Sequence, residues 1–197
     1  MLHRDDRAAK LGMWLFLFTE VLLFGGLFIV YAIYRYLNPE DFHHGSEHLD
    51  LFFGTFNTVV LITSSFTVAA SITATQKGQI KAAIWLLVIT IVLALLFMVN
   101  KYFEWGHKFE IGLYPNGHYF NELPNGEKLF FVLYYFMTGL HGLHVLIGAV
   151  IIGFAIVRLK QGKQSSDNYA FQENAGLYWH LVDLIWIFLF PLMYLIT

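Results

Sequence analysis

The hydrophobic residues of the chain gather into five long runs that polar segments separate. A helix that crosses a bilayer needs roughly 20 consecutive, mostly apolar residues. The connectors are polar, and one of them contains PNG twice, which is typical of turns. The pattern predicts an all-α integral membrane bundle: a single domain, residues 1–197, with five transmembrane helices at about 11–36, 51–75, 81–105, 128–158 and 174–197.

The composition supports a membrane protein and removes several other classes. Hydrophobic residues make up 57% of the chain and charged residues only 13%, which is about half the usual share in soluble proteins. A hydrophobic soluble bundle is the alternative, and five runs of this length argue against it. Cysteine is absent, which excludes disulfides and thiolate metal sites. The net charge of −2 and the lack of a basic run give no indication of a nucleic-acid partner.

The distribution of lysine and arginine predicts the orientation of the bundle, because positive residues collect on the cytoplasmic side of a membrane. The side that holds the N-terminus carries eight of them: Arg4, Arg7, Lys10, Lys77, Lys81, Arg158, Lys160 and Lys163. The opposite side carries four: Arg35, Lys101, Lys108 and Lys128. We therefore expect a cytoplasmic N-terminus and a C-terminus outside. The first run has no small-residue cleavage site, so we expect it to be retained rather than removed as a signal peptide.

A few ionisable residues lie inside the apolar runs, where charge is costly and marks protein-facing or water-facing positions. They are Glu20, His141, His144, His180 and Asp183. At about 1.5 Å of rise per residue, the distances of Glu20, His144, His180 and Asp183 from the nearest N-terminal-side charges allow these four side chains to meet in that half of the bundle. Small and polar residues also recur every seven positions at Asn57, Ser64 and Ser71. Such stripes are typical of helix–helix contacts in lipid.

The residues alone leave three roles open for this set. Imidazole and carboxylate groups ligate metals or haem, although two histidines three residues apart are a weak signal. Chains of acids and histidines also carry protons in membranes. The third role is structural, with polar groups that hold helices, a partner subunit or lipid head groups together. A standalone proton-coupled transporter is a further alternative, but no inverted repeat or broken helix is visible.

Four blocks of sequence resemble subunit III of the haem–copper oxidases, the cytochrome c oxidase type. They are LGMWLFLFTEVLLFGGLF (11–28), NTVVLITSSFT (57–67), FFVLYYFMTGLHGLHVLIGAVII (130–152) and YWHLVDLIWIFLFPLMYL (178–195). The blocks are long and follow the order of the family. The resemblance extends from about residue 10 to the end of the chain.

The resemblance implies a non-catalytic subunit of a proton-pumping terminal oxidase in aerobic respiration, in the plasma (inner) membrane of a bacterium. Such a subunit holds no haem or copper, which lie in partner subunits, so no metal, cofactor or catalytic residue is expected in this chain. It stabilises subunit I, binds phospholipids and supports proton uptake. Subunit II, other oxidase subunits and a larger respiratory supercomplex are further implied partners. Short relatives also belong to quinol oxidases or accompany nitric oxide reductases, so the electron donor stays open.

The resemblance also assigns roles to individual residues. The family's intramembrane carboxylate, which reacts with carbodiimides, falls on Glu20, with Thr19 in place of the family's serine. Its paired histidines fall on His141 and His144, and its terminal WHxVD motif falls on Trp179, His180 and Asp183. Glu20 is expected to have a proton-related role. The lipid-contacting or helix-packing residues are expected to be Asn57, Ser64, His141, His144, Trp179, His180 and Asp183.

One feature departs from the mitochondrial form, which has seven helices. This chain begins at what would be the third helix of that form and so resembles the short, five-helix bacterial form. Two alternatives are open: either an extended subunit I supplies the other two helices, or the lipid cleft of this form is more open.

Overall fold

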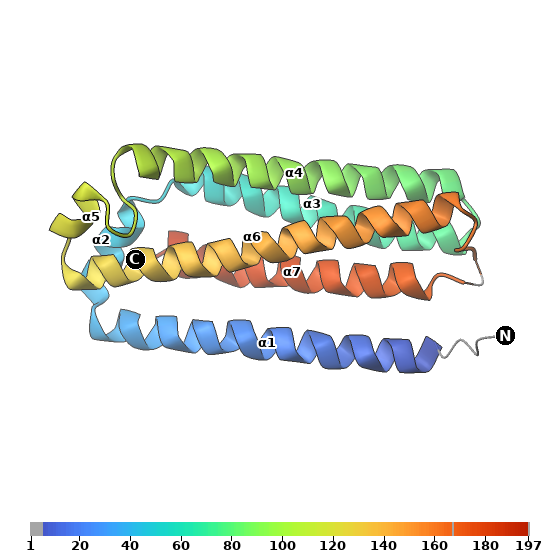
Figure 1. The fold of residues 1–197 in the computed structure, drawn as a ribbon, viewed down its shortest axis with the longest axis horizontal. Coiled ribbons are helices and arrows are strands. Elements are labelled where there is room, and N and C mark those ends of the chain that lie inside the picture. The colour runs from blue at the N-terminus through green and yellow to red at the C-terminus, as the bar shows by residue number, and fades with distance from the viewer. Residues whose placement is uncertain (1–5, 167, 197) are drawn as a thin grey trace.

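The computed structural model describes residues 6–166 and 168–196, and it consists of helices (Figure 1). Five are long: α1 (Asp6–Leu37), α3 (Leu51–Gln76), α4 (Ile80–Glu110), α6 (Asn125–Lys160) and α7 (Ala170–Tyr194). Two are short: α2 (Pro39–Glu47) and α5 (His118–Glu122). The described residues contain no strand beyond an isolated bridge between Ser165 and Asn168. The predicted all-α fold with five spanning helices is confirmed.

Each long helix has the length and composition needed to cross a bilayer. The shortest, α7, has 25 residues, or about 38 Å at 1.5 Å per residue, which exceeds the roughly 30 Å hydrocarbon core. α7 ends at Tyr194 rather than at Thr197, which lies outside the described residues, as does Arg4 of the charge count. The chain is therefore a multi-pass membrane protein, and the exact membrane boundaries within the helices stay predictions.

Four of the long helices form a closed bundle. α3 packs against α4 and α7, and α6 packs against the same two helices. α1 runs along the outside of this bundle, on the side of α6 and α7 (Figure 1). In its most apolar stretch only 17% of the residues are buried, compared with 50% in α7. The other side of α1 therefore presents an apolar surface to lipid or to another chain.

Glycines allow the helices of the bundle to approach closely. A β-carbon at Gly148 of α6 would lie 2.8 Å from the ring of Trp179 on α7, and one at Gly176 would lie 2.8 Å from Ile72 on α3. Both distances are shorter than van der Waals contact, so a side chain at either position would require its neighbour to move, most severely at Gly148, where the neighbour is the rigid indole ring. The predicted stripe of Asn57, Ser64 and Ser71 lies in the same interior, and all three residues are 0% exposed. Small and polar positions thus form the α3–α7 and α6–α7 interfaces.

The two ends of the bundle differ. α2 and α5 lie at the end where the described chain finishes, and the N-terminus lies at the other end (Figure 1). We call these the α2/α5 end and the N-terminal end. α2 packs against α6 and also contacts α1 and α7, with Phe42 fully buried between Tyr31 and Phe130. This short helix closes the bundle at the α2/α5 end.

Candidate functional site

Glu20 on α1 and His144 on α6 form a hydrogen-bonded pair inside the membrane span. The Oε2 atom of Glu20 lies 2.9 Å from Nε2 of His144, and the two side chains are only 13% and 11% exposed. The other ring nitrogen, Nδ1, lies 2.7 Å from the carbonyl oxygen of Leu140. The ring of Phe24 packs edge-on against the imidazole with 5.3 Å between centroids, and the Tyr178 hydroxyl donates to the backbone carbonyl oxygen of His144.

The contacts of His144 determine where the protons of this pair lie. A carbonyl oxygen only accepts, so Nδ1 of His144 carries a proton and donates it to Leu140. Nε2 then either donates to an ionised Glu20 or accepts from a protonated one. In both cases one proton lies between the two side chains. The geometry therefore allows one proton to be shared between the carboxyl group of Glu20 and the imidazole of His144.

His141 occupies a different environment from His144. It is 0% exposed, and its ring packs against Phe97 at 5.5 Å and Trp186 at 5.2 Å between centroids. Neither of its ring nitrogens has a hydrogen-bond partner among the described residues. The two histidines therefore lie in different surroundings, since His141 faces the core of the bundle and His144 faces α1.

His180 and Asp183 on α7 face α3. Nδ1 of His180 lies 2.6 Å from the hydroxyl oxygen of Ser65, while Asp183 is 3% exposed and lies near the same serine. The serine hydroxyl satisfies the histidine, and neither carboxylate oxygen of Asp183 has a well-formed hydrogen bond in the described chain. The expected meeting of Glu20, His144, His180 and Asp183 is thus only partly found. Glu20 joins His144 across α1 and α6, whereas His180 joins Ser65 across α7 and α3.

The remaining predicted residues form contacts between helices. The indole nitrogen of Trp179 donates to the Ser64 hydroxyl at 2.9 Å, linking α7 to α3. The side chain of Asn100 on α4 donates to the oxygen of Asn57 on α3 at 2.9 Å. Trp179, Ser64 and Asn57 are all 0% exposed. Their positions suit helix packing, because no lipid reaches them.

Sequence reasoning missed a buried charged cluster at the α2/α5 end of the bundle. Glu104 on α4 accepts hydrogen bonds from Tyr134 on α6 at 2.7 Å and Tyr194 on α7 at 2.6 Å. Two lysines of α4 flank it, with Lys101 at 2.9 Å and Lys108 at 3.6 Å. The charge count had used both lysines only as markers of the membrane surface. Their spacing from Glu104, three and four residues, is the signal that indicates an intrahelical pair.

The buried polar pairs and the charged cluster around Glu104 differ from metal centres in the side chains that they bring together. Within residues 6–166 and 168–196, no group of three or more histidine, aspartate or glutamate side chains is placed to hold a metal ion. The pairs and the charged cluster instead satisfy one another or contact hydroxyl groups. Such contacts suit proton-holding and structural roles more than ligation.

Five apolar helices joined by buried polar contacts define an integral membrane subunit of the helical-bundle class. The model of the family described as "Cytochrome c oxidase subunit III" matches residues 4–197. The chain belongs to this family, and the predicted family resemblance is thereby confirmed.

Curated relatives agree over nearly the whole chain. The cytochrome c oxidase subunit 3 of Thermostichus vulcanus is 33% identical over 199 residues, covering 99% of this chain and 90% of that protein. That of Synechocystis sp. is 34% identical over 195 residues, covering 98% and 77%. A protein of Aeropyrum pernix named "Heme-copper oxidase subunit I+III" is 29% identical over 191 residues, which cover 93% of this chain and 22% of that protein.

Proposed function

We propose that the chain is the non-catalytic subunit III of a proton-pumping haem–copper terminal oxidase, with the redox centres in other subunits. Family membership supports this role. The main support for a partnership with subunit I comes from the Aeropyrum pernix relative, whose name joins subunits I and III in one protein. A covalent fusion of two subunits is expected where the two work side by side. The chain would then dock on subunit I and assemble with subunit II, other oxidase subunits and a larger respiratory assembly.

The apolar surface of α1 supports docking and phospholipid binding. Most of its span is uncovered by the rest of the chain, and large exposed apolar surfaces mark contacts with protein or membrane. In the orientation predicted from the lysine and arginine count, the N-terminal end faces the cytoplasm of a bacterium and the α2/α5 end faces the periplasm. The Glu20–His144 pair then lies toward the cytoplasmic side, where protons enter a pump. We propose that it supports proton uptake.

Co-purification tests the main proposal. A tagged chain, expressed in its own membrane and extracted in mild detergent, is expected to bring down a larger subunit that contains haem and copper. Pure, colourless, monodisperse chain without any such partner would overturn the proposal. Oxidation assays on the same preparation with reduced cytochrome c and with a quinol identify the electron donor, and so separate a cytochrome c oxidase from a quinol oxidase.

Chemical labelling tests the role of Glu20. A hydrophobic carbodiimide in the membrane is expected to modify Glu20, because this carboxyl group is partly open at 13% side-chain exposure. Glu20→Gln should prevent the labelling, leave the complex assembled and lower proton uptake modestly, since electron transfer occurs in another subunit. Loss of all electron transfer in a fully assembled Glu20→Gln complex would contradict this role.

A further inference from the structure

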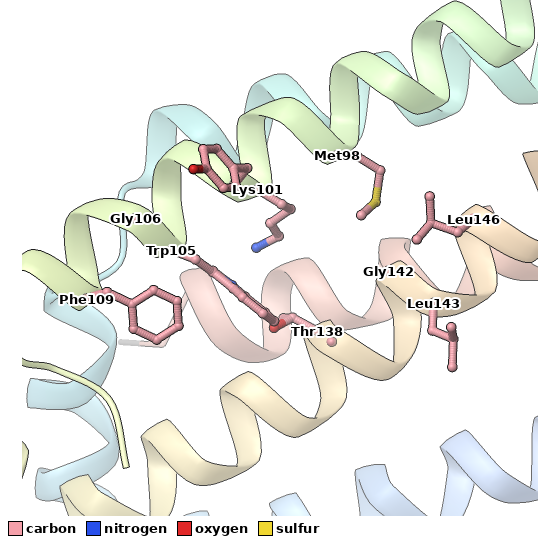
Figure 2. Close-up of a pocket in the computed structure, with 11 residues that line it drawn as sticks. Met98, Lys101, Trp105, Gly106, Phe109, Thr138, Gly142, Leu143 and Leu146 are labelled. Carbon is pink, nitrogen blue, oxygen red and sulfur yellow. The ribbon is translucent and has the colours of Figure 1, made fainter. Parts of the chain in front are cut away.

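Two of the cavities between the long helices differ in their relation to the Glu20–His144 pair. The cavity between α4 and α6 has a volume of about 490 Å³, and the ammonium group of Lys101 is directed into the space between these helices (Figure 2). That ammonium group already donates to Glu104 and Tyr194. Its charge is therefore satisfied inside the bundle, and we assign no ligand to the α4/α6 cavity.

A second cavity, of about 470 Å³, lies between α1, α6 and α7 toward the N-terminal end of the bundle, and we call it the N-terminal cavity. The residues of its lining that matter here are Met13 on α1, Ile151 and Arg158 on α6, and Asn174 and Ala175 on α7. Met13 precedes Glu20 by seven residues along α1, which is about 10 Å. Ile151 follows His144 by the same interval along α6. The cavity therefore lies on the N-terminal side of the pair, between the two helices that form it.

The mouth of the N-terminal cavity carries polar groups. Arg158 is exposed, and its guanidinium carbon lies 4.5 Å from the centre of the Phe171 ring. The side-chain oxygen of Asn174 is buried and accepts no hydrogen bond from the described residues. An amide oxygen without a donor is costly in an apolar environment. Because the predicted span of α7 begins at about residue 174, water at the membrane surface can supply that donor.

Two aromatic rings lie between the N-terminal cavity and the pair. Tyr178 follows Asn174 by one helical turn, is 2% exposed, and stacks on Phe16 of α1 with 6.0 Å between ring centroids. Its hydroxyl donates to the backbone carbonyl oxygen of His144 at 3.2 Å. Gly148 of α6 leaves room for the ring, since a β-carbon there would lie 3.1 Å from it. The Tyr178 ring thus lies against α6 at a level between the cavity and the imidazole.

We propose that water enters the N-terminal cavity and exchanges a proton with the Glu20–His144 pair, and that the Tyr178 ring is the partition that sets the rate. In the exchange, an O–H bond of a hydronium ion in the cavity breaks while the pair gains one proton, and the pair then returns one proton to water. The hydroxyl bond to α6 holds the partition closed, and displacement of the ring opens it. The inference deepens the proton uptake in the proposed function and rests on it.

Hydrogen–deuterium exchange of the pair tests the route. The purified oxidase complex, or the full chain if no partner co-purifies, is placed in bilayer nanodiscs and mixed rapidly with D₂O, and the infrared bands that disappear in Glu20→Gln are followed. Ala175→Leu fills the cavity from α7 and is expected to slow the exchange several-fold. Met13→Trp fills it from α1 and serves if Ala175→Leu does not assemble. The matched control is Met98→Trp, which fills the α4/α6 cavity instead and should leave the rate unchanged.

The same measurement tests the partition. Tyr178→Ala removes the ring and is expected to speed the exchange several-fold. Tyr178→Phe keeps the ring and loses only the hydroxyl bond to His144, so its rate should lie between those of the wild type and Tyr178→Ala. A purely structural role for Tyr178 would lower the unfolding midpoint of these variants without changing the exchange rate.

Three outcomes overturn the inference. An unchanged rate in both cavity-filling variants shows that water reaches the pair by another route or that lipid alone occupies the cavity. An equal slowing in Met98→Trp shows a general effect of larger side chains on the bundle. An unchanged rate in Tyr178→Ala removes the partition. The proposed function fails separately: if proton uptake by the complex is unchanged in Glu20→Gln, the pair has no part in uptake, and the exchange rates still decide the route.

Discussion

α1 and the α3/α4/α6/α7 bundle are both made of apolar helices, yet they are held in different ways. Inside the bundle, polar contacts are buried and join three helices at once, as when Glu104 of α4 accepts from Tyr134 and Tyr194. α1 is joined to α6 and α7 through separate contacts that each link two helices, and some of these are exposed, such as the ion pair of Lys10 with Glu173. The bundle therefore stabilises itself, whereas α1 depends on its surroundings. Substitutions of buried polar residues in the bundle should therefore destabilise the protein more than substitutions at the contacts of α1.

The largest effect is expected in the bundle, at Glu104. Glu104→Gln removes the one negative charge between two buried ammonium groups, and breaking a buried ion pair in this way costs about 3–5 kcal/mol. The unfolding midpoint of the detergent-solubilised protein in a thermal scan should fall sharply. Glu110→Gln is the matched control, because Glu110 is exposed on the same helix. Equal midpoints for the two variants would show that the cluster does not hold the bundle together.

A smaller effect is expected where the bundle loses one hydrogen bond. Ser64→Ala leaves the buried indole N–H of Trp179 without its acceptor, at a cost of about 1–3 kcal/mol. Thr63→Ala provides the comparison, since the Thr63 hydroxyl is exposed and bonds only within its own helix. The unfolding midpoint of Ser64→Ala should be lower than that of Thr63→Ala, because only the first variant leaves a buried group without its partner. A control that loses as much as Ser64→Ala would contradict this.

Next in size is the contact that docks α1 on α6. Glu20→Ala removes the hydrogen bond to His144, and such interhelical bonds in membranes contribute about 0.6 kcal/mol on average and about 1.7 at most. Cross-linking between cysteines introduced on the facing surfaces of α1 and α6 should fall while the bundle keeps its midpoint. Glu20→Gln retains a group that can hydrogen-bond to the ring, so it should cross-link nearly as the wild type does. A large loss of bundle stability in Glu20→Ala would erase the distinction between the two regions.

The smallest effect is expected at the membrane surface of α1. Lys10 and Glu173 are 46% and 32% exposed, and ion pairs of this kind contribute about 0–1 kcal/mol and weaken with salt. Lys10→Ala should reduce the same cross-linking slightly at low salt and not at all at high salt. An effect that persists at high salt would mean that Lys10 holds α1 by more than charge. Lys81 is an exposed lysine of α4, and Lys81→Ala should have no effect on the cross-linking between α1 and α6.

The sequence predicted the five helices well because a bilayer demands long apolar runs, and each run is visible without any knowledge of the others. It also indicated that Asn57, Ser64 and Ser71 share one face, since the spacing of seven is a local property of a helix. The partner of each polar residue was beyond reach. Glu20 contacts His144 and not His180 because of how α1 is rotated and placed against α6 and α7, which local spacing does not determine.

The charged cluster around Glu104 shows a second reason why the sequence could not predict the whole site. Counting lysines for orientation treats them as surface markers, and this assumption hid Lys101 and Lys108, which are 7% and 4% exposed. Their spacing from Glu104 was readable as an intrahelical pair. The two tyrosines that complete the cluster come from α6 and α7, 30 and 90 residues away. Only the packing of three helices brings them together.

The hydrogen bond between Tyr31 and α7 affects the order in which the helices can pack during synthesis. The Tyr31 hydroxyl donates to the carbonyl oxygen of Leu192, 161 residues later, where the helix is about to end and its last carbonyls lack partners within it. The partners of Lys10 and Glu20 also lie later in the sequence, on α7 and α6 respectively. α3 and α4, as neighbours in the chain, can pair as soon as both are inserted. α1 precedes α6 and α7 in the sequence, so it is expected to complete these contacts only after both of those helices have been inserted.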